Sequence, residues 1–325
     1  MGASGSSRLP RVAVLDDYQG VATAFGPWDR LAGRAEVQVF PDHVADLDAL
    51  VRRLRPFDVV VAMRERTPFG RDLVTALENL RLLVTTGPRN AAVDLAACAE
   101  RGVTVCGTGA ASNGTAELTW ALILAAVRHL PEELASVRAG GWMTTVGGDL
   151  AGARLGVVGL GRLGSQVARI GLAFGMDVVA WSANLTAERC ADVGVSLVAR
   201  DELLATSDVV SVHLVLSERT RGLIGAAELA RMKPTAWLVN TSRGPVCDEA
   251  AVAEACRSGG IAGACVDVYD REPLAVGHPF RSLPNVLATP HVGYVTARGY
   301  ERFFTEVVDD IVAWLDGSPV RVLGA

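Results

Sequence analysis

Residues 157–164 read Val-Val-Gly-Leu-Gly-Arg-Leu-Gly, and the rest of the chain is organised around this stretch. An apolar run at 155–158 leads into the pattern G-x-G-x-x-G, and a helical pattern follows from Arg162 to Phe174. A strand that turns directly into a helix leaves backbone N–H groups and the positive end of the helix dipole directed at one spot. Because glycines there let a pyrophosphate approach the backbone, this context predicts a dinucleotide-binding turn.

The composition is that of a globular protein. With 325 residues, half of them apolar and 21% charged, the chain has room for two domains with a sizeable core. A net charge of -5 and the lack of a basic block argue against a nucleic-acid partner. The longest apolar run, residues 118–127, is too short to span a membrane. Residues 1–10 are rich in Gly and Ser and lack the apolar region of a signal peptide.

The cysteines show no C-x-x-C spacing and do not cluster with the histidines, so no metal site is expected. Most lie in apolar segments, which is typical of small core residues in a reducing compartment, and a cytoplasmic location is expected. The six are Cys98, Cys106, Cys190, Cys247, Cys256 and Cys265.

Two series of apolar strands alternate with helix-length spacers, a pattern that predicts α/β architecture with parallel sheets covered on both faces. The first series lies at 11–15, 59–62, 82–84 and 103–105. The second, expected to form a doubly wound sheet with two mononucleotide-binding halves, lies at 155–158, 178–181, 196–198, 209–213, 237–240, 264–268 and 286–288.

Two long helices connect the series. One opens at 112–114, with Ser112 or Asn113 as N-cap, and runs to His129. The other, at 296–315, has an apolar face but no sheet of its own to cover, so we expect it to return to the first domain. The predicted domains are therefore 1–112 plus 294–325, discontinuous, and 113–293, with a hinge over a cleft between them.

Polar residues that follow strands of the second sheet are candidates for chemistry, because ligands of such sheets bind beyond the carboxyl ends of the strands. Arg243 follows the strand at 237–240 and can clamp a carboxylate, although a lone arginine there is more often a surface residue. Asp267, Glu272 and His291 follow the next two strands. A carboxylate bonded to an imidazole favours the imidazolium, which can donate a proton to a carbonyl oxygen.

The residues resemble the D-isomer-specific 2-hydroxyacid dehydrogenases over about 73–320. The motifs that carry the resemblance are VGLGRLG at 158–164, LVNTSRGPV at 238–246, DVYDREPL at 267–274 and NVLATPHVGYVT at 285–296. It implies a flavodoxin-like substrate domain, a Rossmann cofactor domain and a homodimer formed through about 118–150. It also implies transfer of a hydride between a nicotinamide cofactor and C2 of a 2-oxo or D-2-hydroxy acid, as in hydroxypyruvate or glyoxylate reductases.

The resemblance also implies the roles of individual residues. Arg243, Glu272 and His291 match the catalytic triad, in which the arginine holds the substrate carboxylate and the histidine, oriented by the glutamate, donates the proton. Asp267 matches the residue that holds the nicotinamide carboxamide. The remaining cofactor contacts are expected from Gly159, Gly161, Arg162, Leu163, Gly164, Ser182, His213 and Thr241.

The choice between NAD and NADP stays open at Ser182. NAD-selective relatives carry an aspartate after the second strand of this sheet, where this chain has Ser182-Ala183-Asn184. The missing carboxylate removes a repulsion against a 2′-phosphate, yet no arginine follows directly, and Arg189 is as well explained as a solvated helix residue. NAD is favoured slightly.

Loops of the first domain are expected to contact the substrate. The candidates are Arg64, in the loop 63–67, or Arg89 with Asn90, in the loop 86–90, which would bind a second polar or anionic group of the substrate. The alternative is that these arginines form surface salt bridges. The motifs are equally compatible with a dinucleotide-sensing binding protein that has the same fold and little turnover.

Overall fold

The computed structural model describes residues 8–109 and 113–324, which divide into two compact units. Residues 8–109 and 295–324 belong to the first, and 113–294 to the second. The expected N-cap Ser112 and the Gly/Ser-rich start at 1–7 lie outside the described residues. No described helix is long and apolar enough to cross a membrane.

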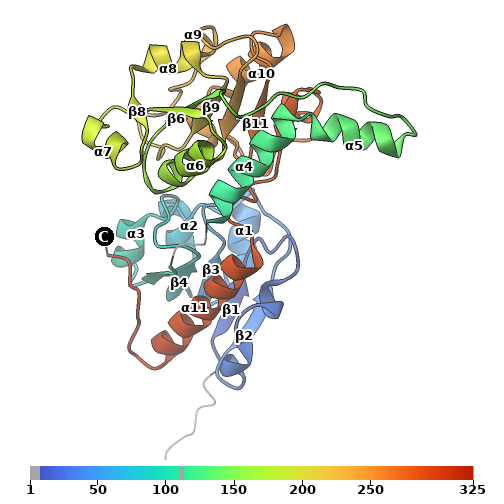
Figure 1. Ribbon diagram of the computed structural model, residues 1–325. Coiled ribbons are helices and arrows are strands. Elements are labelled where there is room, and N and C mark those ends of the chain that lie inside the picture. The colour runs from blue at the N-terminus through green and yellow to red at the C-terminus, as the bar shows by residue number, and fades with distance from the viewer. Residues whose placement is uncertain (1–7, 110–112, 325) are drawn as a thin grey trace, which may run out of the picture. The chain divides into compact units, whose positions relative to one another are not determined.

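The first unit is a five-stranded parallel sheet in the order β2-β1-β3-β4-β5 (Figure 1). Its strands are β1 (Arg11–Val14), β2 (Glu36–Val39), β3 (Val59–Ala62), β4 (Leu82–Thr85) and β5 (Thr104–Gly107). Its helices are α1 (Leu47–Leu54), α2 (Arg71–Ala76), α3 (Leu95–Glu100) and α11 (Ala297–Leu315), with short 3-10 turns at Ala22–Ala24 and Trp28–Leu31.

Strand β2 was not predicted from the sequence. Its four residues are exposed or half-buried, whereas β3 and β4 are buried throughout. As the edge strand, β2 pairs only with β1 and carries no continuous apolar run.

Helix α11 packs on the first unit. Thr296 caps it by accepting a hydrogen bond from the N–H of Gly299. Its buried face includes Phe303, Phe304, Val307, Val308 and Ile311. After the helix the chain returns to β5, where the N–H of Leu323 donates to the carbonyl of Val105 at 2.8 Å.

The second unit is a seven-stranded parallel sheet in the order β12-β11-β10-β9-β6-β7-β8. Counted from β6, this is the Rossmann order, and it confirms the predicted doubly wound class. The strands are β6 (Arg154–Val158), β7 (Asp177–Trp181), β8 (Ser196–Leu197), β9 (Val209–Val212), β10 (Trp237–Asn240), β11 (Gly263–Val266) and β12 (Val286–Ala288). The helices are α4 (Gly114–Val127), α5 (Leu130–Arg138), α6 (Arg162–Ala173), α7 (Ala187–Ala191), α8 (Arg200–Thr206), α9 (Ala226–Leu229) and α10 (Glu249–Ser258), with 3-10 turns at Gly244–Val246 and Pro279–Arg281.

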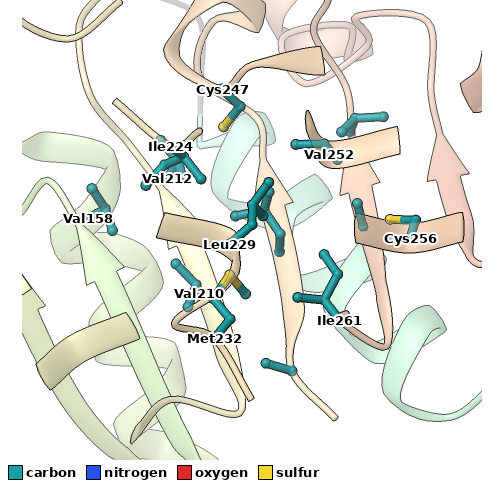
Figure 2. Close-up of a cluster of buried hydrophobic side chains, with 14 of the residues drawn as sticks. Val158, Val210, Val212, Ile224, Leu229, Met232, Cys247, Val252, Cys256 and Ile261 are labelled. Atoms are coloured by element: carbon teal, nitrogen blue, oxygen red, sulfur yellow. The ribbon is translucent and has the colours of Figure 1, made fainter. Parts of the chain in front are cut away.

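Two apolar clusters cover the faces of this sheet because neighbouring strand residues point to opposite sides. Val158 and Val210 join Leu229 of α9 and Val252 of α10 on one face (Figure 2). On the other face, side chains of β6 and β9 pack with those of α4 and α6, among them Val157, Val209, Trp120 and Val167.

Asn113, one of the two expected N-cap residues, is the N-cap of α4, but its side chain makes no capping bond; its Oδ1 accepts from the Nε2 of Gln166 at 2.9 Å. Helix α5 was not expected, and it has no buried residue. A helix without a buried face lacks the apolar periodicity by which helices are recognised.

Candidate active site

The three glycines of the motif, at the loop between β6 and α6 and in the first turn of α6, have different surroundings. Gly159 has φ +101°, and an added Cβ would lie 2.8 Å from the carbonyl oxygen of His213. At Gly164 the same atom would lie 1.9 Å from the carbonyl oxygen of Gly159, whereas at Gly161 it would meet no atom within 4 Å. The first and third glycines thus serve the turn and the packing, and the second leaves open space for a ligand. This loop fits the pyrophosphate of a dinucleotide.

The strands β6 and β9 mark the point where the strand order reverses, and His213 follows β9 there. Its N–H donates to the carbonyl of Val158, and its Nε2 lies 2.8 Å from the Oγ of Ser211. Burial lowers the pKa of His213 to about 4, so the ring is neutral at pH 7. Of the other residues beside the loop, Arg162 is exposed, and Leu163 and Ser182 are half-buried, as His213 is.

Thr241 and Asp267 follow β10 and β11 and are both buried. The Oγ1 of Thr241 lies 2.8 Å from the Oγ1 of Thr119 on α4. The carboxylate of Asp267 accepts from the hydroxyl of Thr289 at 2.6 Å and from the N–H groups of Val292 and Gly293 at 2.8 Å each. Burial raises the pKa of Asp267, while these three bonds oppose the rise. Asp267 therefore holds the two residues that follow His291.

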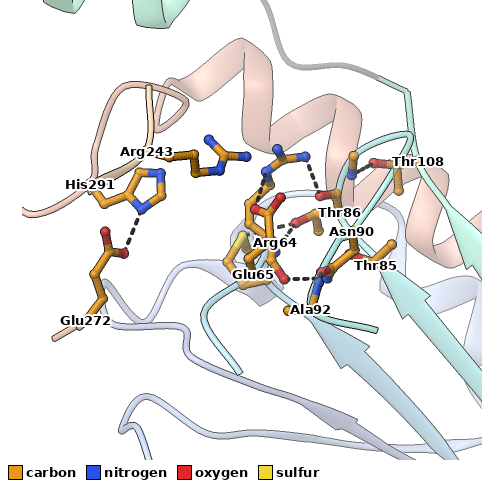
Figure 3. Close-up of polar contacts among 12 residues, drawn as sticks. Arg64, Glu65, Thr85, Thr86, Asn90, Ala92, Thr108, Arg243, Glu272 and His291 are labelled. Atoms are coloured by element: carbon orange, nitrogen blue, oxygen red, sulfur yellow. Dashed lines mark hydrogen bonds and ion pairs between the residues drawn. The ribbon is translucent and has the colours of Figure 1, made fainter. Parts of the chain in front are cut away.

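His291 and Glu272 form a hydrogen-bonded pair (Figure 3). The Nδ1 of His291 lies 2.6 Å from the Oε2 of Glu272, and both side chains are largely buried. The second carboxylate oxygen, Oε1, accepts from the N–H of Tyr269 at 3.0 Å, so the carboxylate is held at both ends. His291 has φ +53°, a left-handed conformation that is uncommon for a residue with a side chain.

Arg243 lies directly before a 3-10 turn and is half-buried. Its carbonyl accepts from the Nδ2 of Asn240 at 3.0 Å, and its Nη1 donates to the carbonyl of Ser242 at 2.7 Å. A Cβ at Gly244 would lie 2.1 Å from the backbone carbon of Tyr269. The loop that carries Arg243 is therefore packed against the loop that carries Glu272.

Tyr269 joins the loops that carry Arg243, Glu272 and His291. It was not singled out from the sequence. Its N–H binds Glu272, its backbone packs on Gly244, and its hydroxyl donates to the carbonyl of Thr289 at 2.8 Å. Burial and nearby carboxylates raise its pKa, so the hydroxyl stays protonated. The only sequence feature that could have indicated its role is its position within the motif at 267–274.

Within the first unit, Arg64 and Asn90 are bonded to one another. The Nδ2 of Asn90 donates to the carbonyl of Arg64 at 2.7 Å and to the Oγ1 of Thr85 at 2.9 Å, and its Oδ1 accepts from Ala92 (Figure 3). The Asn90 amide thus acts within the protein, while Arg89 is exposed.

The side chain of Arg64 lies over Gly87. Its Nη1 donates to the carbonyl of Thr86 at 3.0 Å, and a Cβ at Gly87 would lie only 1.7 Å from that nitrogen. Gly87, which the sequence analysis also passed over, provides the space for this guanidinium.

Among the described residues no group of His, Cys, Asp and Glu has the arrangement of a metal site. The cysteines at the six positions named above are free and buried.

The sheet has the Rossmann order, and the glycine motif at 159–164, here called the glycine cradle, lies where the strand order reverses. These two features define a dinucleotide-binding protein. Residues 120–293 match the NAD binding domain of the D-isomer specific 2-hydroxyacid dehydrogenases. The chain belongs to this family, and NAD is the cofactor of the matched domain.

Similar proteins carry several names. A hydroxypyruvate reductase from Thermotoga maritima is 35% identical over 93% of this chain and 97% of its own length. A glyoxylate reductase from Aeropyrum pernix is 38% identical over 76% of this chain and 77% of its own length. A phosphoglycerate oxidoreductase structure from Vibrio cholerae superposes with a TM-score of 0.91 at 37% identity, covering 95% of this chain and all of that one. The chain spans about half, 52%, of the D-3-phosphoglycerate dehydrogenase from Archaeoglobus fulgidus that it matches.

Proposed function

We propose that the protein catalyses hydride transfer between NAD and C2 of a small 2-oxo or D-2-hydroxy acid. The observation that carries this proposal is the His291–Glu272 pair, tied through Tyr269 to the loop of Arg243 and located in the unit that holds the glycine cradle. NAD, when bound, supplies or accepts the hydride.

Each residue of this group has a separate task. The planar guanidinium of Arg243 binds the substrate carboxylate. Glu272 accepts the bond from Nδ1 of His291, which leaves Nε2 as the ring atom that donates a proton to the carbonyl oxygen during reduction. Asp267 holds the turn after His291 and contacts the nicotinamide carboxamide, and Thr241 and His213 line the cofactor.

Hydroxypyruvate and glyoxylate are the proposed substrates. The names of the relatives from Thermotoga maritima and Aeropyrum pernix support them. Arg64 or Arg89 contacts a second polar or anionic group of the substrate, and Asn90, which donates to the carbonyl of Arg64, positions Arg64. We expect Arg89→Ala to raise KM with kcat unchanged, and an unchanged KM for every accepted substrate would remove Arg89 from the site. Arg101→Ala, another exposed arginine of the first unit, is the control.

A turnover assay over a panel of 2-oxo acids, followed by the absorbance of NADH, tests the function. The expected result is oxidation of NADH with hydroxypyruvate, glyoxylate or a bulkier analogue, and formation of the corresponding 2-hydroxy acid, with D configuration wherever C2 is a stereocentre. Tight NADH binding without turnover on any of them would instead identify a dinucleotide-sensing protein.

Helix α5 and the segment 139–149 are the proposed homodimer contact. The helix extends from the end of α4 and has no buried residue (Figure 1). Trp142, Met143 and Val146 in the segment are 75%, 78% and 93% exposed. Large apolar side chains at such exposure are typical of interaction sites. Sedimentation of the protein and of Trp142→Ser tests this contact, since the substitution should shift the dimer toward monomer.

The buried, free cysteines support the proposed cytoplasmic location.

A further inference from the structure

The turn after β7 lies where Rossmann domains contact the adenosine ribose. Ser182 follows this strand about 20 residues after the glycine loop, the spacing at which NAD-binding domains place a carboxylate for the ribose hydroxyls. The N–H of Leu185 donates to the carbonyl of Ser182 at 3.1 Å, and Thr186 then caps α7 by accepting from the N–H of Arg189 at 3.3 Å. Arg189 is thus fixed at the start of a short helix directly after this turn.

The side chain of Arg189 extends to Ser165 in α6. Its Nη2 donates to the Oγ of Ser165 at 2.9 Å. That hydroxyl in turn donates to the carbonyl of Leu160, between the first two glycines, at 3.2 Å. The guanidinium therefore joins the ribose-side turn to the pyrophosphate loop through one serine, which a freely solvated helix residue would not do.

Two acidic residues near this turn, Asp177 and Glu188, are engaged within the protein. The acidic residue of β7, Asp177, is at the start of the strand and is paired with Arg154 at 2.6 Å. Glu188 is on the same turn as Arg189. Hydrogen bonds from its own backbone N–H and from Thr186 lower its pKa, so its carboxylate is engaged at the start of α7. Ser182, a neutral hydroxyl, repels neither a ribose hydroxyl nor a phosphate.

We propose that Arg189, aligned by Ser165 and assisted by Ser182, binds a phosphate on the 2′-oxygen of the adenosine ribose, so that the protein accepts NADP(H) as well as NAD(H). A guanidinium has five N–H donors, and the bond to Ser165 uses one of them. The planar fork of arginine matches phosphate oxygens in a bidentate geometry. This inference rests on the dinucleotide site of the proposed function but needs no turnover.

Calorimetric titration with adenosine 2′,5′-bisphosphate and with 5′-AMP tests the inference, because the two nucleotides differ only in the 2′-phosphate. In the unmodified protein we expect the bisphosphate to bind about tenfold or more tightly, the effect of one or two charge-assisted bonds. In Arg189→Ala the two dissociation constants should become nearly equal, with that of 5′-AMP unchanged. Ser182→Asp should make 5′-AMP bind more tightly than the bisphosphate, because the added carboxylate repels the 2′-phosphate.

Two further variants separate a specific contact from general charge. Arg257→Ala removes a positive charge from α10, where Arg257 pairs with Glu254, and should leave the ratio of dissociation constants intact. Ser165→Ala should lower the ratio without abolishing it, since the charge stays but its alignment is lost. The preference for NADPH over NADH, measured as the ratio of their dissociation constants, should change among the variants in the same order as the preference for the bisphosphate over 5′-AMP.

Equal affinities for the two nucleotides in the unmodified protein would overturn the inference, as would a ratio that survives Arg189→Ala. In either case NADH binding and turnover would still support the dehydrogenase function. Failure of both nucleotides and of NADH to bind would overturn the inference and the proposed function together.

Discussion

The imidazole Nδ1 of His291 and the carboxylate Oε2 of Glu272 lie 2.6 Å apart, and the other oxygen of that carboxylate accepts from the N–H of Tyr269. A carboxylate held at both ends fixes the direction of the imidazole, and Nε2 is the atom from which we propose that the proton is donated.

Glu272→Gln should lower kcat/KM by about 10²-fold or more, because the amide can keep the contact but not the charge that stabilises an imidazolium. Steady-state kinetics between pH 5 and 9 provide the measurement, and the pH dependence should change together with the rate. The dissociation constant of NADH serves as the control and should stay constant. A rate close to that of the unmodified protein would show that Glu272 does not support proton transfer.

Gly161→Ala and Gly164→Ala form a matched pair with opposite expected effects. An added Cβ at Gly161 meets no atom within 4 Å, so the melting temperature should hold while the NADH dissociation constant rises roughly tenfold or more. At Gly164 the atom would lie 1.9 Å from a carbonyl oxygen, and overpacking of this kind destabilises a fold by about 1–3 kcal/mol. Thermal melting and NADH fluorescence titration on both variants provide the test. Unchanged NADH affinity in Gly161→Ala would argue against the pyrophosphate cradle.

Asp310 should make the stability of the first unit depend on pH. Burial raises its pKa to about 7, although Arg321 lies 3.0 Å away and opposes the rise. Between the unfolded value near 3.8 and about 7 the folded state binds a proton that the unfolded state does not. The contribution of Asp310 to stability therefore falls as pH rises through this range.

Asp310→Asn mimics the protonated acid and should remove that slope. Denaturant unfolding of both proteins at pH 5 and pH 8 gives the comparison. The variant should gain more stability, relative to the unmodified protein, at pH 8 than at pH 5. An equal difference at both pH values would mean that Asp310 stays ionised throughout.

The sequence predicted those parts of the fold in which burial is continuous. Strands such as β3 and β9 are covered on both faces and therefore read as unbroken apolar runs. The edge strand β2 and the exposed helix α5 were missed because neither buries a continuous face within its own unit.

The site residues were partly predictable for a different reason. A parallel sheet brings the carboxyl ends of its strands to one edge, so polar residues after β10, β11 and β12 could be grouped without knowing any side-chain contact. The role of Tyr269 could not be predicted, because its contact with Gly244 depends on the packing of two loops far apart in sequence. The bond from Arg189 to Ser165 likewise spans 24 residues and leaves no local pattern.

The most direct test of the central claim is the single-turnover rate of NADH oxidation, measured by stopped flow with the best 2-oxo acid of the panel. Unmodified protein, Arg243→Ala and His291→Ala are compared after each is loaded with NADH. Both variants should retain NADH but lose about 10²-fold or more in rate, and His291→Ala should also flatten the pH dependence of the rate. A near-native rate in either variant would contradict that claim.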